Sequence, residues 1–276
     1  MSEIKLLALD LDDTLLREDL TISFHTKNVL KKVEESGVIV MLASGRSPAA
    51  MDRYARDLGM HKRPGYLVCN NGTTILESHT GAIVKEFFLP IEAALAVYDL
   101  VDAEGFPVQI YDEGTIYVSR HNEYADIDQK LTGQRQVVVD NFRSFLAAGA
   151  QKMVIPGDPS LLRPLETLLK TFIGDRVTIF TSKPYFLEIL PPATGKGEAL
   201  AVVAQMLGID RSQVMAIGDS MNDESMIRWA GFGVAMANGD ARIKAIAKAI
   251  TNRTNEEDGV ADFVEQYLLK GRAHAG

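Results

Sequence analysis

Acidic side chains crowd the end of the first apolar segment of the chain. The run Asp10-Leu11-Asp12-Asp13-Thr14 directly follows the segment Ile4 to Leu9 and places three carboxylates within four residues. At a separation of about 4 Å and an effective dielectric constant of about 20, each close pair of carboxylates costs roughly 4 kcal/mol. Mg²⁺ suits such a site, because it prefers one or two carboxylates together with water and phosphate oxygens. A solvated acidic turn is the alternative interpretation of this segment taken alone.

Three more polar clusters occur further along the chain. Ser44-Gly45-Arg46 offers a hydroxyl and a backbone N–H at a turn, which can hold a phosphoryl oxygen. Gly195-Lys196-Gly197 fixes an ammonium group that can neutralise a phosphate and an aspartate. Gly218-Asp219-Ser220-Met221-Asn222-Asp223 adds two carboxylates and a carboxamide. Each cluster alone also has a purely structural interpretation, as a local cap, a surface lysine or a capped helix start.

Short apolar segments alternate with helical patterns around these clusters, which predicts an α/β fold with a parallel sheet. The strands are expected at Ile4 to Leu9, Val38 to Ala43, Tyr66 to Cys69, Val214 to Ile217 and Phe232 to Met236. The carboxyl ends of parallel strands share one edge of the sheet, where ligands bind in open α/β folds. We therefore expect all four clusters to meet at that edge. Together they are a specific indication of a functional site, whereas each cluster alone is not.

The middle of the chain has a different pattern. Strand-like segments that pair as hairpins, such as Val108 to Tyr111 with Ile116 to Ser119, are mixed with helical patterns there. This predicts an α+β domain, residues 84–190, inserted into a discontinuous α/β core formed by residues 1–83 and 191–276.

Composition narrows the classes of protein that the chain can belong to. The 276 residues carry a formal charge of −8 at pH 7, which argues against nonspecific nucleic-acid binding and against a polybasic membrane anchor. We find no apolar run of the roughly 18–20 residues that a membrane span needs and no signal-peptide pattern. Cys69 is the only cysteine, so neither a disulfide framework nor a thiolate metal cluster is expected. We predict a cytoplasmic protein with no nucleic-acid or membrane partner.

The four clusters together resemble the motifs of the haloacid dehalogenase-like superfamily of phosphatases. These motifs are Asp-x-Asp-x-Thr, a Ser or Thr, a Lys, and Gly-Asp-x-x-x-Asp, and all occur here in that order. Three further segments are similar to those of the Cof-type branch, close to YidA-like sugar phosphatases. They are Ser44-Gly45-Arg46, Asn71-Gly72 and Glu257-Asp258-Gly259. The resemblance covers nearly the whole chain and implies a Rossmann-like core with an inserted cap that reads the substrate. Asp13 departs from the pattern, since many relatives carry glycine there.

The resemblance implies a role for each matching residue. Asp10 would attack phosphorus to form an aspartyl-phosphate and would also ligate Mg²⁺. Asp12 would protonate the leaving alkoxide and then activate water, while its backbone carbonyl ligates the metal. Asp219 would complete the metal site, and Asp223 would support it from behind the direct ligands. The phosphate oxygens would be held by the backbone of Leu11 and by Ser44, Gly45, Lys196 and Asn222.

These roles predict a Mg²⁺-dependent phosphatase of small phosphorylated metabolites, foremost sugar phosphates, that acts as a monomer or homodimer. For the first step Asp12 must be protonated, so its pKa is expected to be raised. A phosphosugar mutase on the same fold is one alternative, in which the phosphoryl group is transferred to a sugar instead of water. A non-enzymatic receiver module that is phosphorylated on aspartate is another, but the chain is more than twice as long as such a module needs.

Overall fold

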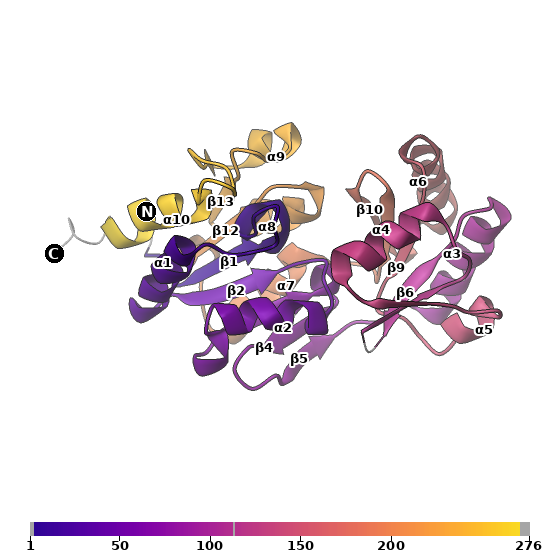
Figure 1. Ribbon diagram of the computed structural model, residues 1–276, viewed down its shortest axis with the longest axis horizontal. Coiled ribbons are helices and arrows are strands. Elements are labelled where there is room, and N and C mark those ends of the chain that lie inside the picture. The colour runs from indigo at the N-terminus through magenta and orange to yellow at the C-terminus, as the bar shows by residue number, and fades with distance from the viewer. Residues whose placement is uncertain (1–2, 113, 271–276) are drawn as a thin grey trace. The chain divides into compact units, whose positions relative to one another are not determined.

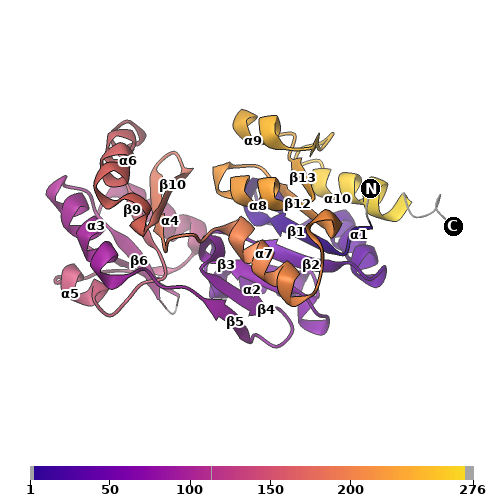
Figure 2. The same cartoon turned by 180° about the vertical axis from the view of Figure 1, so that it is seen from behind.

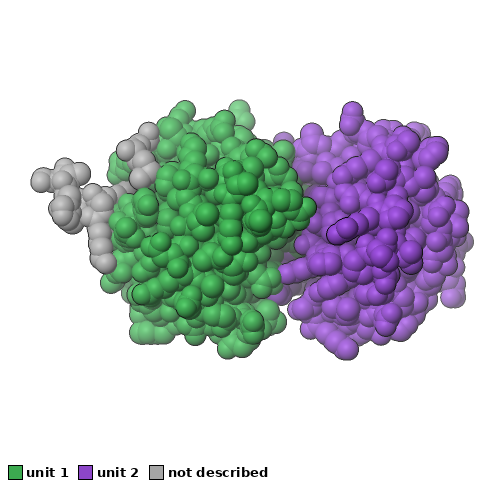
Figure 3. All heavy atoms as spheres, turned by 90° about the horizontal axis from the view of Figure 1, so that it is seen from above, with its two compact units in different colours: residues 1–45, 51–84, 195–276 green, residues 46–50, 85–194 purple. Residues whose placement is uncertain are grey.

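The computed structural model describes residues 3–112 and 114–270, and the chain divides into two compact units (Figure 3). The first, here called the core, comprises Met1–Gly45, Met51–Val84 and Gly195–Gly276. The second, here called the insert, comprises Arg46–Ala50 and Lys85–Thr194. The sequence analysis set this division after residues 83 and 190, and the roles that it gave to the two parts stay predictions. None of the described helices is both long enough and apolar enough to cross a membrane.

The core is built on a sheet of order β14-β13-β12-β1-β2-β3-β4-β5 (Figure 1). Its strands are β1 (Leu6–Asp10), β2 (Ile39–Ala43), β3 (Tyr66–Cys69), β4 (Thr74–Glu77), β5 (Ile83–Glu86), β12 (Val214–Gly218), β13 (Phe232–Ala235) and β14 (Ala249–Ile250). Its helices are α1 (Phe24–Glu35), α2 (Pro48–Asp57), α7 (Lys196–Met206), α8 (Glu224–Trp229), α9 (Ala241–Ile246) and α10 (Gly259–Val264). Strands β14 to β3 pair in parallel, and β4 runs antiparallel to β3.

The continuous apolar run of β1 follows from burial on both faces of the sheet. Leu7 and Leu9 pack with apolar residues of α1, α2 and α10, whereas Leu6 and Ala8 pack with residues of α7, α8 and α9. Side chains alternate between the faces of a strand, so a strand covered on both sides needs apolar residues at every position. Figures 1 and 2 show these helix layers from opposite sides. The core is therefore a three-layer α/β/α sandwich, and the predicted fold class is confirmed.

The insert has its own sheet of order β10-β11-β9-β6-β7-β8. Its strands are β6 (Gln109–Asp112), β7 (Thr115–Val118), β8 (Arg135–Val138), β9 (Met153–Pro156), β10 (Thr178–Lys183) and β11 (Phe186–Leu190). Its helices are α3 (Ile91–Ala103), α4 (Glu123–Thr132), α5 (Phe142–Leu146) and α6 (Pro159–Ile173). One face of this sheet packs with α3, α5 and α6 in a single apolar cluster. Ala125 of α4 packs with Ile116 and Val118 in a separate, smaller cluster.

Candidate active site

The carboxyl edge of the core sheet brings acidic side chains and a lysine into direct contact. Asp10 ends β1, and Asp219 and Asp223 follow β12, the strand that pairs with β1. Lys196 begins α7, and its Nζ donates hydrogen bonds to Oδ1 of Asp10 and Oδ1 of Asp223, both at 2.6 Å. Lys196 is completely buried. These ion pairs are therefore shielded from water, unlike the weak pairs of protein surfaces.

The carboxylates of this site outnumber the cations that contact them. One oxygen from each of Asp10, Asp219 and Asp223 lies within 4.8 Å of the others, and all three residues are buried. The ammonium group of Lys196 can balance only one of these charges. A divalent cation would supply the positive charge that is missing, and carboxylate oxygens are the ligands that Mg²⁺ prefers. The donor set therefore fits such an ion.

The pKa values of the site reflect burial first and the neighbouring negative charges second. Burial, and next the charge of Asp223, raises the pKa of Asp10 to about 7. Burial, and next the charge of Asp10, raises the pKa of Asp219 to about 9. Burial also disfavours the charged form of Lys196, but the two carboxylates beside it prevail and hold its pKa above the usual value. Clustered groups with perturbed pKa values are typical of functional sites.

Asp223 binds both Lys196 and the backbone of the loop after β12. Its second oxygen, Oδ2, accepts hydrogen bonds from the backbone N–H groups of Asp219 at 2.9 Å and Ser220 at 3.1 Å. A carboxylate that is fully buried is therefore satisfied on both oxygens. The sequence analysis placed Asp223 behind the direct metal ligands. In the structure Asp223 also contacts Lys196 directly, and one of its oxygens lies within 4.8 Å of oxygens of Asp10 and Asp219. Its role toward a metal stays a prediction.

The loop after β1 is a short helical turn, Leu11–Leu15, that contains irregular backbone angles at Asp12 and Asp13. The side chain of Leu11 is fully buried in the core. Asp12 is half-buried and outside the carboxylate group described above, although its charge contributes to the raised pKa of Asp10. Thr14 is buried, and its Oγ1 donates a hydrogen bond to Asp219 Oδ1 at 3.1 Å. Sequence reasoning gave Thr14 no role, even though it is the last residue of the first motif.

The residues expected to hold phosphate follow strands of the same sheet. Ser44 is buried and comes directly after β2, and its backbone N–H donates to the carbonyl of Val68 in β3 at 2.9 Å. Asn222 is half-buried in the turn that leads from β12 to α8. Another contact that sequence reasoning missed ties this turn to α7, because the backbone N–H of Gly197 donates to Ser225 Oγ at 2.9 Å. The core sheet thus brings all four motifs to one edge.

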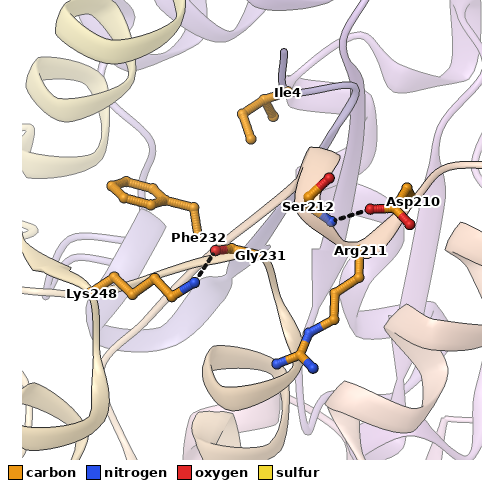
Figure 4. Close-up of a pocket in the computed structure, with 7 residues that line it drawn as sticks. All are labelled: Ile4, Asp210, Arg211, Ser212, Gly231, Phe232 and Lys248. Atoms are coloured by element: carbon orange, nitrogen blue, oxygen red, sulfur yellow. Dashed lines mark hydrogen bonds between the residues drawn. The ribbon is translucent and has the colours of Figure 1, made fainter. Parts of the chain in front are cut away.

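A separate hollow of about 520 Å³ lies at the opposite edge of the core sheet, where β12, β13 and β14 begin (Figure 4). Lys248 in its lining donates to the carbonyl of Gly231 at 2.6 Å, and Arg211 donates to the carbonyl of Arg228 at 2.7 Å. Both cations are therefore already bound to backbone oxygens. The four motifs lie at the other edge of the sheet.

The chain matches the haloacid dehalogenase-like hydrolase family over residues 7–264. It belongs to this family. YxeH of Bacillus subtilis (strain 168) is 31% identical over 271 residues, covering 96% of this chain and 98% of that protein. The phosphatase YcsE of the same organism, named for 5-amino-6-(5-phospho-D-ribitylamino)uracil, is 29% identical over 267 residues and 97% of each chain. A crystal structure of a haloacid dehalogenase-like hydrolase from Bacteroides thetaiotaomicron superposes with a TM-score of 0.86 at 32% identity, covering 96% of this chain and all of that one.

Family membership confirms the resemblance that the four motifs carried. The chain is a phosphoric monoester hydrolase, and the phosphatases of this family act on small phosphorylated substrates. Its buried group of aspartates has the composition of a metal site, in a family that generally uses a metal ion.

Proposed function

We propose that this hydrolase is a Mg²⁺-dependent phosphatase of sugar phosphates and related metabolites that works through an aspartyl-phosphate on Asp10. One observation carries the proposal. Lys196 bridges Asp10 and Asp223 inside a buried group of three aspartates that outnumbers the cations in contact with it. Asp10, Asp219 and the backbone carbonyl of Asp12 would hold Mg²⁺. When bound there, the ion would supply the positive charge that the carboxylates and the phosphoryl oxygens together require.

In the first step an oxygen of Asp10 attacks phosphorus, so that a bond from aspartate to phosphorus forms and the bond to the leaving oxygen breaks. The attacking group must be ionised. Burial works against this by raising the pKa of Asp10, while the hydrogen bond from Lys196 at 2.6 Å favours the carboxylate. Lys196 thereby keeps the nucleophile charged and in a fixed orientation.

Asp12 is proposed as the acid and base of both steps. It would give its proton to the leaving alkoxide and then take a proton from the water that attacks the aspartyl-phosphate, which releases phosphate and restores Asp10. Its position on the turn after β1, two residues from the nucleophile and half-buried, supports this role.

The remaining contacts would position the phosphoryl group, which is the main task of a catalyst for phosphoryl transfer. Ser44 and Gly45 would offer a hydroxyl and a backbone N–H, Asn222 a carboxamide N–H, and Leu11 a further backbone N–H. These donors come from the ends of three strands, so that they would hold phosphate oxygens from several directions.

The proposed substrate class rests on the relatives and on the insert. YcsE is named for a substrate that carries its phosphate on a ribityl chain, which is chemically close to a sugar phosphate. The insert would act as a cap that reads the leaving group. We also propose that the enzyme works in the cytoplasm, as a monomer or homodimer.

The test is phosphate release from an aryl phosphate, with the purified enzyme stripped of metal by chelation and then given Mg²⁺. We expect activity only with Mg²⁺, and none in Asp10→Asn. Asp13→Asn is the matched control, because it removes the same charge from an exposed position three residues away and is expected to keep activity within about threefold. Retained activity in Asp10→Asn would rule out the covalent mechanism. Isomerised sugar phosphate without free phosphate would favour the mutase.

A further inference from the structure

The turn Asn70–Gly72, directly after β3, links parts of the site that are far apart in sequence. Asn71 lies in this turn with left-handed backbone angles, φ 56° and ψ 34°, and is only 1% exposed. Its backbone N–H donates to the carbonyl of Ser44 at 2.9 Å. Its side-chain Oδ1 accepts a hydrogen bond from Nδ2 of Asn222 at 3.2 Å. One residue therefore contacts two of the segments that we propose to bind phosphate.

The carboxamide of Asn222 is held at both ends. Ser220 Oγ accepts from the backbone N–H of Asp223 and donates its own proton to Asn222 Oδ1 at 2.6 Å. The nitrogen end donates one of its two N–H bonds to Asn71. A carboxamide has one acceptor oxygen and two N–H donors, so one donor remains for a phosphoryl oxygen. If the group turned over, its oxygen would face the anion and repel it.

The same turn packs against the loops on either side of it. At Gly72, where φ is 103°, an added Cβ would lie 2.2 Å from the carbonyl oxygen of Gly195, directly before Lys196. At Gly45, an added Cβ would lie 3.0 Å from the side-chain nitrogen of Asn71. The backbone of the turn therefore touches the lysine loop, and the Asn71 carboxamide rests on the loop that carries Ser44.

We propose that Asn71 is a positioning residue that fixes the donor orientation of Asn222 and the relative placement of the phosphate-binding loops. This inference rests on the proposed function, since it takes Asn222 and Ser44 as phosphate ligands. Asn71 itself acts through these residues. The left-handed backbone explains why asparagine suits the position, because asparagine tolerates αL better than other residues with a side chain.

The test compares Asn71→Gly with wild type by titration calorimetry of inorganic phosphate in the presence of Mg²⁺ and by steady-state kinetics. Glycine keeps the left-handed backbone and its N–H to Ser44, and removes only the carboxamide. We expect phosphate to bind about tenfold more weakly and KM to rise by a similar factor, with a smaller change in kcat.

A double-mutant cycle distinguishes positioning from general damage. Once Asn222→Ala has removed the donor, adding Asn71→Gly is expected to weaken phosphate binding by less than twofold more. Leu20→Gly is the control, because it puts glycine at another left-handed position, φ 61°, in a loop outside the four motifs. It is expected to lower the melting temperature without changing phosphate affinity.

Unchanged phosphate affinity in Asn71→Gly, or additive losses in the cycle, would overturn the positioning role. Wild type that binds phosphate but does not release it from an aryl phosphate would overturn the proposed function, while the cycle on phosphate binding would still decide the role of Asn71. Wild type that binds no phosphate would overturn both.

Discussion

Each unit of this hydrolase buries charged side chains, but the partners of these side chains differ between the core and the insert. In the insert, Asp128 accepts hydrogen bonds from the Tyr111 hydroxyl and the Gln109 carboxamide, and Nζ of Lys152 lies 3.5 Å from a carboxylate oxygen of Glu188. All but Tyr111 are at most 6% exposed. The acids of the insert thus have a cation or neutral donors beside them, whereas the core gathers three carboxylates around one lysine.

We interpret the buried charge of the insert as part of its folded structure and the buried charge of the core as part of the proposed reaction. Burial raises the pKa of Asp128, and its carboxylate accepts hydrogen bonds from two neutral side chains, Tyr111 and Gln109. In the core the ammonium group of Lys196 contacts two of the three clustered carboxylates, and a bound cation would balance the group further. An unpaired buried charge costs several kcal/mol, and such a cost is tolerated where function requires it. Four changes test this comparison.

The largest effect is expected from Lys196→Met, which removes the cation that contacts Asp10 and Asp223. We expect phosphate release to fall at least about 10³-fold, because the nucleophile loses its orientation and its charge partner. The free energy of unfolding without metal should fall by about 3–5 kcal/mol. Measured together, the two losses identify the lysine as part of both the chemistry and the charge balance. An active variant would contradict the role in the chemistry, and an unchanged free energy of unfolding would contradict the role in the charge balance.

Lys152→Met is the corresponding change in the insert. It leaves Glu188 buried without this cation, so the free energy of unfolding should fall by about 3 kcal/mol in urea titrations. The kcat for an aryl phosphate should stay within about threefold. A large loss of kcat at unchanged stability would break the comparison and would place the buried charge of the insert in catalysis.

Metal binding should stabilise the enzyme through the core alone. At Mg²⁺ concentrations about 100-fold above the dissociation constant, the free energy of unfolding should rise by about 2.7 kcal/mol. The rise should vanish in Asp219→Asn and persist in Lys152→Met, and unfolding with and without Mg²⁺ measures it. A rise that Asp219→Asn leaves intact would place the ion elsewhere.

The smallest effect concerns the pH dependence of the insert. Burial, opposed by the Tyr111 hydrogen bond and the charge of Lys152, leaves the pKa of Asp128 above its ordinary value of 3.8. The folded state therefore binds this proton more tightly than the unfolded chain. Its stabilising contribution is complete below about pH 4 and is lost as the pH rises through the folded pKa.

Asp128→Asn cannot titrate and keeps an acceptor oxygen for Tyr111 and Gln109. The stability of the variant relative to wild type should therefore increase from pH 4 upward, as urea unfolding over a pH series would show. A difference that stays constant with pH would mean that Asp128 has the same pKa in the folded and unfolded chains.

The frame of this hydrolase and the identity of its motifs can be predicted from the amino-acid sequence alone. Strands buried on both faces must be apolar throughout, so β1, β2, β3 and β12 stand out as runs, and polar residues that follow such runs must meet at one edge. The elements α4, β8 and α5 of the insert were not predicted. Helix α4 buries only Ala125 and Asp128, so it carries almost no apolar periodicity.

The partners of the individual side chains depend on the tertiary structure. Asp10 and Lys196 are 186 residues apart, and nothing in either motif specifies that the lysine also binds Asp223. The same holds for Thr14 with Asp219 and for Asn71 with Asn222, which are joined across 205 and 151 residues. A local pattern fixes the type and face of a residue, whereas a hydrogen bond depends on the packing of several elements at once. The motifs were therefore readable from the sequence, and the contacts that position them were not.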